Sequence, residues 1–302
     1  MSSTRTHPMG TKGLTIGVFD SGFGGLTVLR ELLPLAAGSH VVYLGDTARL
    51  PYGSKSRETI VRYALSSARF LQQRGAQLLV VACNTATALA LDELREALPI
   101  PVVGVIQPGV EAASVASREA GTVGEVLVLA TQATIESHAY ARACAALGLK
   151  ATEKACPLLV PLVEEGWIGE ETPSASGSAG DTARSSVTAQ VLRIYLGESL
   201  RQALHCRALL LGCTHYPLLR PAIEHTLTEL GHPLRVIDSA QATARAVERV
   251  LSEQGIARGG RADAGEATCE FFATDSVRKF ERLGSRFLGR PVGQVQLVDL
   301  GG

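Results

Sequence analysis

Two cysteines occupy matching places in this 302-residue chain. The stretch "LLVVACNTAT" holds Cys83, and the stretch "LLLGCTHYPLL" holds Cys213. In both, the thiol follows an apolar run and precedes side chains that carry hydroxyl, amide or imidazole groups. If the runs are parallel strands, both thiols lie at the carboxyl ends of strands, where open sheets bind ligands and free backbone N–H groups stabilise anions. The sequence therefore predicts a site that uses two thiols.

Other uses of these cysteines are possible. A single buried cysteine is often a small apolar filler of the core, but two in the same polar context favour a functional pair. A zinc site would combine Cys83, Cys213 and His215, yet the spacing matches no zinc motif and a fourth ligand is not evident. The chain has six cysteines and no C-x-x-C pair, so we expect reduced thiols rather than a disulfide framework.

A thiol pair suits the inversion of a carbon centre better than nucleophilic catalysis. A cysteine nucleophile needs one thiol and an activating histidine. Inversion needs one group that removes a proton from one face of the carbon and a second that returns a proton to the other face. A thiolate and a thiol can exchange these roles between the two directions. No lysine lies in a context that indicates a Schiff base, so we expect no pyridoxal phosphate. No full set of metal ligands is evident, so we expect no metal.

Two further segments carry candidate site residues. The Gly-rich turn "VFDSGFGG", residues 18–25, contains Asp20 and Ser21 and fits no phosphate-loop pattern. Asp20 could tune a proton and Ser21 could bind a substrate, although both could instead cap the following helix. In the turn-rich stretch "DTARLPYGSKS", Tyr52 and Gly53 could contact a substrate through their backbone, or belong to an ordinary loop.

Apolar runs that alternate with helical periods must position these residues. This alternation predicts parallel strands joined by crossover helices, covered on both faces. The expected strands span residues 14–19, 40–45, 77–83, 101–106, 125–131, 208–213, 234–239 and 269–274, with a weaker one in "VQLVDL". The expected helices span residues 24–33, 57–74, 86–98, 108–119, 133–147, 187–204, 217–230 and 240–254.

A weak internal repeat indicates two similar units. One expected strand ends at Asp20 and another ends 63 residues later at Cys83, while Thr131 and Cys213 are 82 residues apart. An insertion of about twenty residues in the second unit would account for the difference. Residues 169–190 are rich in Ser, Thr, Gly and Ala without an apolar period, which predicts a flexible surface insertion.

Composition excludes several classes of protein. The 29 basic and 29 acidic residues cancel, and no basic block indicates nucleic acid or an anionic membrane as a partner. No apolar run approaches the roughly 18–20 residues that cross a bilayer. Residues 1–12 lack the apolar segment of a secretory signal, so we expect a disordered leader on a cytoplasmic protein.

Together these motifs resemble those of the glutamate racemase family, the cofactor-independent amino-acid racemases of bacterial cell-wall synthesis. The similar stretches follow the family order: "IGVFDSGFGGLTVL", "YLGDTARLPYGSKS", "VVACNTATALAL", "PVVGVIQPG", "CPLLVPLVEEG" and "LLLGCTHYPLL". The stretch "FFATDSVRKFERLGSRFLG" is similar to the family's tail, whereas residues 169–190 are longer than its usual linker.

The resemblance implies an α/β fold of two similar parallel-sheet domains, related by a pseudo-twofold axis, with the substrate in the cleft between them. The first domain would be discontinuous and comprise residues 13–106 and 222–302, and the second would comprise residues 107–221. The resemblance also implies a homodimer that interconverts L- and D-glutamate without a cofactor and supplies D-glutamate for peptidoglycan.

The resemblance further implies the role of each site residue. Cys83, assisted by Asp20, would take the α-proton from D-glutamate. Cys213, assisted by His215 with Glu164 behind it, would take the α-proton from L-glutamate. The adjacent Glu165 is the alternative to Glu164. Substrate contacts would come from Asp20, Ser21, Tyr52, Gly53, Asn84, Thr85, Thr131, Thr134, Thr214 and His215.

Two other functions stay open at the level of the sequence. A relative on the same two-thiol scaffold could act on aspartate, a hydantoin or maleate, because substrate choice depends on the volume of the pocket. A non-catalytic binding protein could also share the fold. The presence of both Cys83 and Cys213 favours catalysis over this second alternative.

Overall fold

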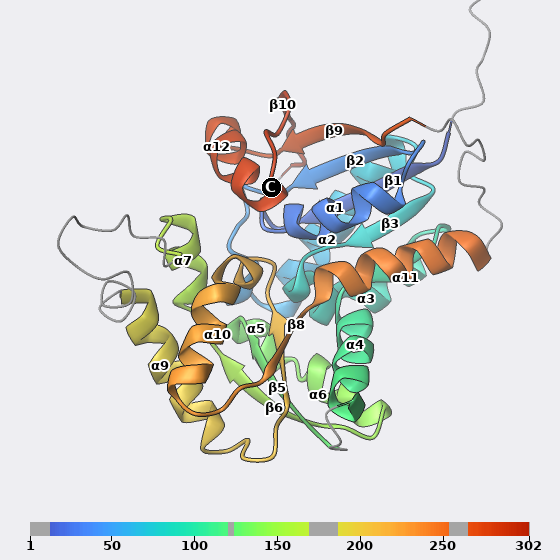
Figure 1. Ribbon diagram of the computed structural model, residues 1–302. Coiled ribbons are helices and arrows are strands. Elements are labelled where there is room, and N and C mark those ends of the chain that lie inside the picture. The colour runs from blue at the N-terminus through green and yellow to red at the C-terminus, as the bar shows by residue number, and fades with distance from the viewer. Residues whose placement is uncertain (1–12, 120–123, 169–186, 254–264, 302) are drawn as a thin grey trace, which may run out of the picture.

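Two parallel β-sheets form the core of the computed structural model, which describes residues 13–119, 124–168, 187–253 and 265–301. Figure 1 shows one sheet above the other. The upper sheet has the order β10-β9-β2-β1-β3-β4 and the lower sheet the order β6-β5-β7-β8. The upper strands are β1 (Thr15–Asp20), β2 (His40–Gly45), β3 (Leu78–Val81), β4 (Val102–Gly104), β9 (Thr268–Ala273) and β10 (Val295–Leu297). The lower strands are β5 (Glu125–Ala130), β6 (Lys150–Ala155), β7 (Ala208–Gly212) and β8 (Arg235–Asp238).

The two sheets repeat one topology. The order β2-β1-β3-β4 in the upper sheet matches β6-β5-β7-β8 in the lower sheet, strand for strand. β1 and β5 are the equivalent central strands, and β3 and β7 are the equivalent strands that lead into Cys83 and Cys213. The predicted α/β fold of two similar parallel-sheet units is thereby confirmed. The internal repeat in the sequence reflects this topology.

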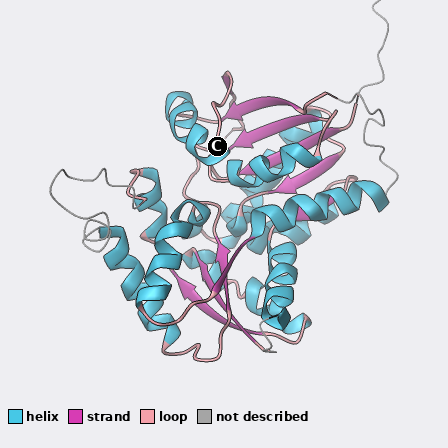
Figure 2. Ribbon diagram, in the orientation of Figure 1, coloured by secondary structure: helices cyan, strands magenta, loops and turns pink. Residues whose placement is uncertain are grey.

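Helices cover both faces of each sheet (Figure 2). The helices beside the upper sheet are α1 (Leu26–Leu32), α2 (Arg57–Gln73), α3 (Asn84–Ala97) and α12 (Val277–Leu288). Those beside the lower sheet are α4 (Ile106–Glu119), α5 (Gln132–Glu136), α6 (Ala139–Ala146), α7 (Leu159–Glu164), α9 (Val187–Leu200) and α10 (Arg220–Glu229). Helix α11 (Ser239–Glu253) packs against both α1 and α4, and thus joins the two units.

Local sequence explains where these elements begin and end. The strands that carry the site are apolar along their length, and every residue of β3 and β7 is buried, as expected for strands covered on both faces. Helix α2 begins where the Ser56 hydroxyl accepts a hydrogen bond from the backbone N–H of Thr59. Helix α12 ends at Gly289, whose φ of 74° lies in the left-handed region. Glycine is favoured there because it has no Cβ to clash with the backbone.

The structure differs from the expected elements at two places and decides between two overlapping predictions at a third. Strand β6 was not predicted, because its sequence "KATEKA" is polar and lies at a sheet edge with one flank open to solvent. The single helix expected over residues 133–147 is two helices, α5 and α6, since His138 adopts a left-handed φ of 54°. Residues 187–190, which the predicted insertion and the predicted helix over 187–204 share, form the first turn of α9, as the helix prediction has it.

The predicted division between residues 221 and 222 does not follow the sheets. Strand β8 lies beyond it, yet β8 pairs with β7 in the lower sheet. The chain returns to the upper sheet only with β9, which pairs with β2. We therefore propose that the second unit extends to Asp238. The leader at residues 1–12 and residues 169–186 of the predicted insertion lie outside the described residues.

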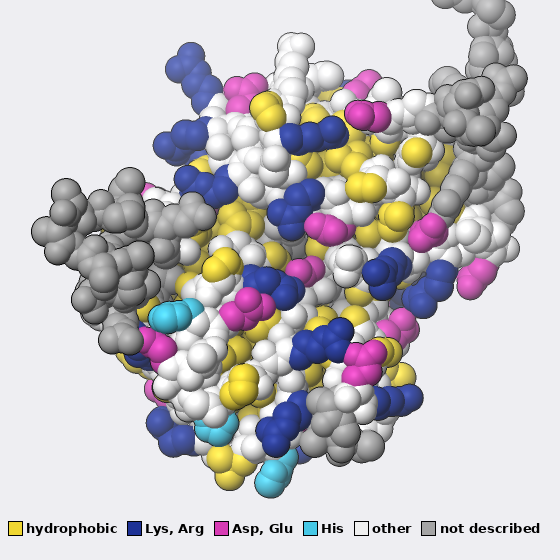
Figure 3. All heavy atoms as spheres, in the orientation of Figure 1, with side chains coloured by type: hydrophobic (Ala, Val, Ile, Leu, Met, Phe, Trp, Pro, Cys, Tyr) yellow, Lys and Arg dark blue, Asp and Glu magenta, His cyan; other side chains and the backbone are white. Residues whose placement is uncertain are grey.

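The surface shows no field of a single charge on the face drawn in Figure 3, where acidic and basic side chains are interspersed. This agrees with the net charge of zero. Within the described residues, no helix is long and apolar enough to cross a membrane.

Candidate active site

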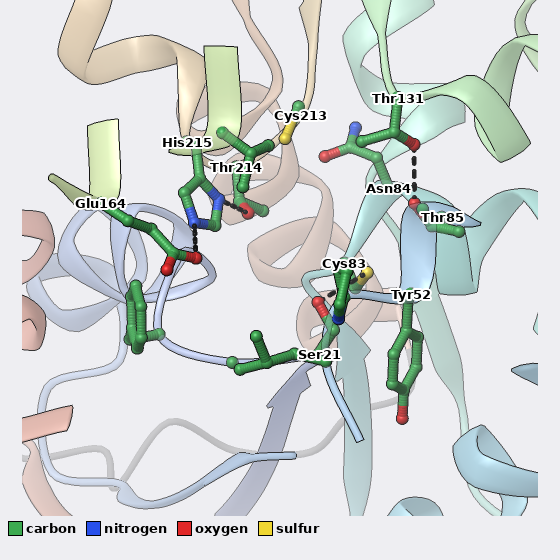
Figure 4. A pocket seen from close by; sticks show the side chains of 16 residues that line it. Ser21, Tyr52, Cys83, Asn84, Thr85, Thr131, Glu164, Cys213, Thr214 and His215 are labelled. Carbon is green, nitrogen blue, oxygen red and sulfur yellow. Dashed lines mark hydrogen bonds and ion pairs between the residues drawn. The ribbon is translucent and has the colours of Figure 1, made fainter. Parts of the chain in front are cut away.

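A cavity lies between the two units, lined by residues that follow β1, β3, β5 and β7. It holds about 490 Å³ of empty space, part of it open to solvent. Figure 4 shows both predicted cysteines in this cavity, on opposite units. The lining residues are Ser21, Gly22, Phe23, Leu50, Pro51, Tyr52, Gly53, Cys83, Asn84, Thr85, Thr131, Val160, Glu164, Cys213, Thr214 and His215.

The thiol of Cys83 lies at the N-terminus of α3. Its Sγ accepts a hydrogen bond from the backbone N–H of Ala86 at 3.5 Å, and the thiol donates to the Ser21 hydroxyl at 3.6 Å. Burial, with a smaller contribution from the negative charge of Asp20, raises the pKa of Cys83 to about 12. The thiol is therefore protonated at neutral pH. The N–H donors around it are arranged to stabilise a thiolate when one forms.

Asp20 lies behind Cys83 rather than in the lining of the cavity. Its side chain is fully buried at the end of β1, and its Oδ2 accepts a hydrogen bond from the backbone N–H of Gly22 at 3.0 Å. Burial raises the pKa of this carboxyl, an effect that the charge of His215 opposes. The Oδ1 atom has no hydrogen-bond partner among the described residues, so this buried carboxylate oxygen is left unsatisfied.

Cys213 is the equivalent thiol of the second unit. It directly follows β7, and only 7% of its surface is exposed. Burial raises its pKa, an effect opposed by a hydrogen bond from the backbone N–H of His215, and reinforced by the nearby Cys83 and Asp20. Both thiols are thus buried and near enough to influence each other electrostatically.

His215 and Glu164 form a pair on the Cys213 side of the cavity. The imidazole Nε2 lies 3.5 Å from Glu164 Oε1, and Nδ1 lies 3.4 Å from the Thr214 hydroxyl. Burial acts to raise the pKa of Glu164, but the charges of His215 and Lys279 and the hydrogen bond from Lys279 bring that pKa below its usual value. Glu164, not Glu165, lines the cavity and contacts the imidazole.

Three threonine hydroxyls form a cluster on the opposite wall. Thr85, Thr131 and Thr134 lie within 2.9–3.2 Å of one another, oxygen to oxygen. Thr85 and Thr131 line the cavity, whereas Thr134 is completely buried behind them. The cluster presents uncharged donors that suit a carboxylate.

Asn84 adds an amide at the base of the cavity. Its Nδ2 donates to the Tyr140 hydroxyl at 2.7 Å, and its Oδ1 lacks a hydrogen-bond partner in the described part of the chain. Because 97% of Asn84 is buried, an unpaired amide oxygen there is costly unless a ligand satisfies it. A ligand that carries an N–H donor would do so.

Tyr52 and Gly53, both predicted to contact a substrate, line the cavity, Tyr52 with its ring and Gly53 with its backbone. The Tyr52 hydroxyl turns away from the cavity and donates to Asp46. The short helix that begins at Tyr52 places Gly53 against Thr131, since a Cβ at Gly53 would lie 2.9 Å from the Thr131 Cβ. This close approach brings loop 50–53 of the first unit onto the second unit.

The Gly-rich turn makes a second close contact between the units. A Cβ at Gly24 would lie 2.3 Å from the Thr214 hydroxyl and 2.6 Å from His215 Nδ1. The Thr27 hydroxyl, at the start of α1, donates to the Thr214 carbonyl oxygen at 3.2 Å. Glycine at position 24 thus leaves room for the catalytic candidates of the other unit.

Sequence reasoning missed several residues of the site. Lys279 of α12 and Tyr140 of α6 contact site residues from distant parts of the chain. Tyr140 bears no sequence signal, and the tail stretch that contains Lys279 does not single this lysine out, because each is a helical residue whose place depends on tertiary packing. Among the described residues no group of three or more His, Cys, Asp or Glu side chains could hold a metal ion.

Comparison with known proteins places the chain in a family. The sequence profile of the Asp/Glu/Hydantoin racemases matches residues 16–247. The chain belongs to this family. It is 46% identical to a glutamate racemase of Koribacter versatilis, over 95% of this chain and 98% of the relative.

Solved structures of family members have the same fold. A glutamate racemase isoform from Bacillus anthracis superposes with a TM-score of 0.80 at 37% identity, over 96% of this chain and 98% of that one. A glutamate racemase from Francisella tularensis, solved with D-glutamate, gives a TM-score of 0.79 at 32% identity and the same coverage. The arrangement of two parallel-sheet units is therefore that of the family.

Proposed function

We propose that the protein interconverts L-glutamate and D-glutamate by moving the α-proton between two thiols, without pyridoxal phosphate or a metal. The observation that carries the proposal is the pairing of Cys83 and Cys213. They follow equivalent strands of two repeated units and line one cavity. Relatives named glutamate racemase, similar over nearly the whole chain, support glutamate as the substrate.

The reaction needs one thiolate and one thiol at a time. In the direction from D-glutamate, the Cys83 thiolate removes the α-proton while Asp20 assists, and the Cys213 thiol protonates the opposite face of the carbanion. In the direction from L-glutamate, Cys213 removes the proton with the help of His215 and Glu164, and Cys83 returns one. Each turnover leaves the two thiols with exchanged protonation, so the enzyme is ready for the reverse reaction.

The remaining lining residues would stabilise the substrate. Hydroxyl donors of Thr85, Thr131 and Thr214 suit the two carboxylates, and the unpaired Asn84 Oδ1 suits the ammonium group. Ser21 would contact the substrate beside Cys83. Because these groups are fixed by the fold in a cavity between the units, they would stabilise negative charge that develops on the α-carboxylate as the proton leaves. Tyr52 and Gly53 would contribute backbone contacts, and Thr134 would hold the hydroxyl cluster together.

The decisive measurement follows the α-proton itself. Purified protein is incubated with L-glutamate, and separately with D-glutamate, in D₂O with EDTA and without added cofactor. We expect circular dichroism to decay to zero from both sides while proton NMR shows deuterium entering the α-position. Folded protein that leaves glutamate unchanged but racemises aspartate would transfer the proposal to aspartate. Inactivity on both amino acids would contradict a racemase function.

The same assay tests the assignment of the thiols. We expect Cys83→Ser and Cys213→Ser each to lower racemisation by about 10³-fold or more, because an alcohol is a far weaker base than a thiolate. Cys144→Ser and Cys269→Ser are the matched controls, since neither thiol lines the cavity. They should retain activity in the fraction that folds.

We also propose a biological role and an oligomeric state for the protein. D-glutamate produced in the cytoplasm would supply peptidoglycan synthesis, and the protein would act as a homodimer. Sedimentation velocity at several protein concentrations tests the oligomeric state. A monomer at every concentration would contradict it.

A further inference from the structure

Lys279 reaches the site from the C-terminal helix α12. Its Nζ lies 2.9 Å from Glu164 Oε2, while the other carboxylate oxygen, Oε1, faces His215 Nε2 at 3.5 Å. One carboxylate therefore bridges a lysine and the histidine of the Cys213 side. Lys279 lies in the C-terminal stretch that resembles the family's tail, but none of the roles described above includes it.

A second contact fixes the position of the ammonium group. Lys279 Nζ lies 5.6 Å from the centre of the Phe23 ring, at a distance suited to a cation–π interaction. The Phe23 ring lies 5.9 Å from the ring of His215, and both rings pack on Phe287 of α12. Lys279, Glu164 and the imidazole thus belong to one packed cluster between the two units.

The ion pair contributes little to stability but can fix a geometry. The Lys279 side chain is 40% exposed and that of Glu164 is 15% exposed, so solvent screens much of the attraction. Its effect on the carboxylate is directional, because Lys279 engages Oε2 and leaves Oε1 for the imidazole. The other cation of α12 on this side, Arg286, lies beside Gly166 rather than at the carboxylate.

We propose that Lys279 is a positioning residue for the Cys213 half of the reaction. It holds the Glu164 carboxylate in the orientation that serves His215, and thereby supports proton transfer at Cys213 in both directions. The Cys83 half, which has Asp20 and no lysine in the described contacts, does not depend on it. This inference rests on the proposed two-thiol racemisation.

Isotope effects separate this role from a merely structural one. The enantiomers have equal free energies in water, so kcat/KM must change equally in both directions in any variant. A general loss of folded protein lowers both values and leaves the isotope effects unchanged. Slower transfer at Cys213 makes that step more rate-limiting. The isotope effect on kcat/KM then rises for α-deuterated L-glutamate and falls for α-deuterated D-glutamate.

The experiment compares Lys279→Met with Lys279→Arg and Arg278→Met in the full-length enzyme. Arg278 is the neighbouring cation on α12, is exposed, and makes none of the hydrogen bonds or ion pairs found among the described residues. We expect K279M to lower kcat/KM about tenfold, with the two isotope effects moving in opposite directions. K279R should restore most of both, and R278M should resemble the wild type.

The outcomes are distinct. If the wild type is active and K279M shows unchanged isotope effects, the proposed role of Lys279 is overturned, whatever the activity of K279M. Wild type that does not exchange the α-proton of glutamate would instead overturn the proposed function, and this inference with it. If K279M does not fold, Lys279→Gln removes the same charge with a polar side chain and must shift the isotope effects in the same directions.

Discussion

Cys83 and Cys213 are both thiols, not thiolates, in the free protein at neutral pH, because burial raises the pKa of each. A base must therefore form when the substrate binds. Glutamate carries two carboxylates and one ammonium group, and the ammonium group would lower the pKa of a thiol directly beside it. In the proposed mechanism, Asp20 and His215 assist the loss of that proton. Burial of the two thiols would thus keep both bases inactive until the substrate binds.

Alkylation of Cys83 should follow this pKa. Iodoacetamide reacts with the thiolate, so its rate with the free enzyme should rise about tenfold per pH unit from pH 7 to 9.5 without a plateau. The negative charge of Asp20 is the second cause, after burial itself, of the raised pKa of Cys83. Asp20→Asn removes that charge, so Cys83 in this variant should react faster at a given pH. Mass spectrometry of the Cys83 peptide measures both rates. A plateau near pH 8 would show that the thiol is already ionised.

At the scale of elements, the Gly-rich turn before α1 sets the distance between the units. Gly24 lies against Thr214 and His215, and Gly25 lies against Asp20, where a Cβ would approach to 2.6 Å. Neither glycine is needed for a left-handed backbone, since neither has a positive φ. Their role is to leave space for the site residues.

Gly24→Ala should therefore damage the site more than the fold. An added methyl must displace the Thr214 hydroxyl or the imidazole, at a cost of about 1–3 kcal/mol in stability. We expect kcat to fall at least tenfold in protein that remains folded. Gly197→Ala is the matched control, because a Cβ there meets nothing within 4 Å and α9 should gain about 0.5–1 kcal/mol. Thermal melts and racemisation rates test both, and normal activity in G24A would contradict this reading of the turn.

Elements differ in how well sequence reveals them. The buried strands β1, β3, β5 and β7 were predicted because both of their faces are apolar. Strand β6 was not, because its place at the sheet edge tolerates the charges of "KATEKA". Cys83 and Cys213 were recognisable because they follow the apolar strands β3 and β7. Lys279 was not, since only the packing of α12 across the cleft brings it to Glu164.

At the scale of the whole molecule, the C-terminal segment ties the site together. The chain leaves the lower sheet after β8, adds β9 and β10 to the upper sheet, and places α12 beside the N-terminal elements (Figure 1). In this segment Thr274 donates a hydrogen bond to Asp46, which also accepts one from the Tyr52 hydroxyl. Lys279 donates a hydrogen bond to Glu164. One segment thus supports residues on both sides of the cavity.

The aromatic contact of α12 with the second unit gives a test of this coupling. Phe287 is fully buried, and its ring lies 5.0 Å from that of His215 in an edge-to-face arrangement. Phe287→Ala should cost about 3–5 kcal/mol in unfolding free energy, as expected for a buried phenylalanine. It should also lower kcat about tenfold or more at a temperature where the variant is folded, because the imidazole loses its packing.

Phe272→Ala is the control for stability alone. Phe272 is equally buried, in β9, but packs on Phe70 in the separate core of the upper sheet. We expect the two variants to lose similar unfolding free energy in urea, while F272A keeps a near-normal kcat in its folded fraction. Equal kcat in both variants would mean that α12 only stabilises the upper unit. A selective loss in F287A would mean that the C-terminal helix positions the catalytic histidine across the cleft.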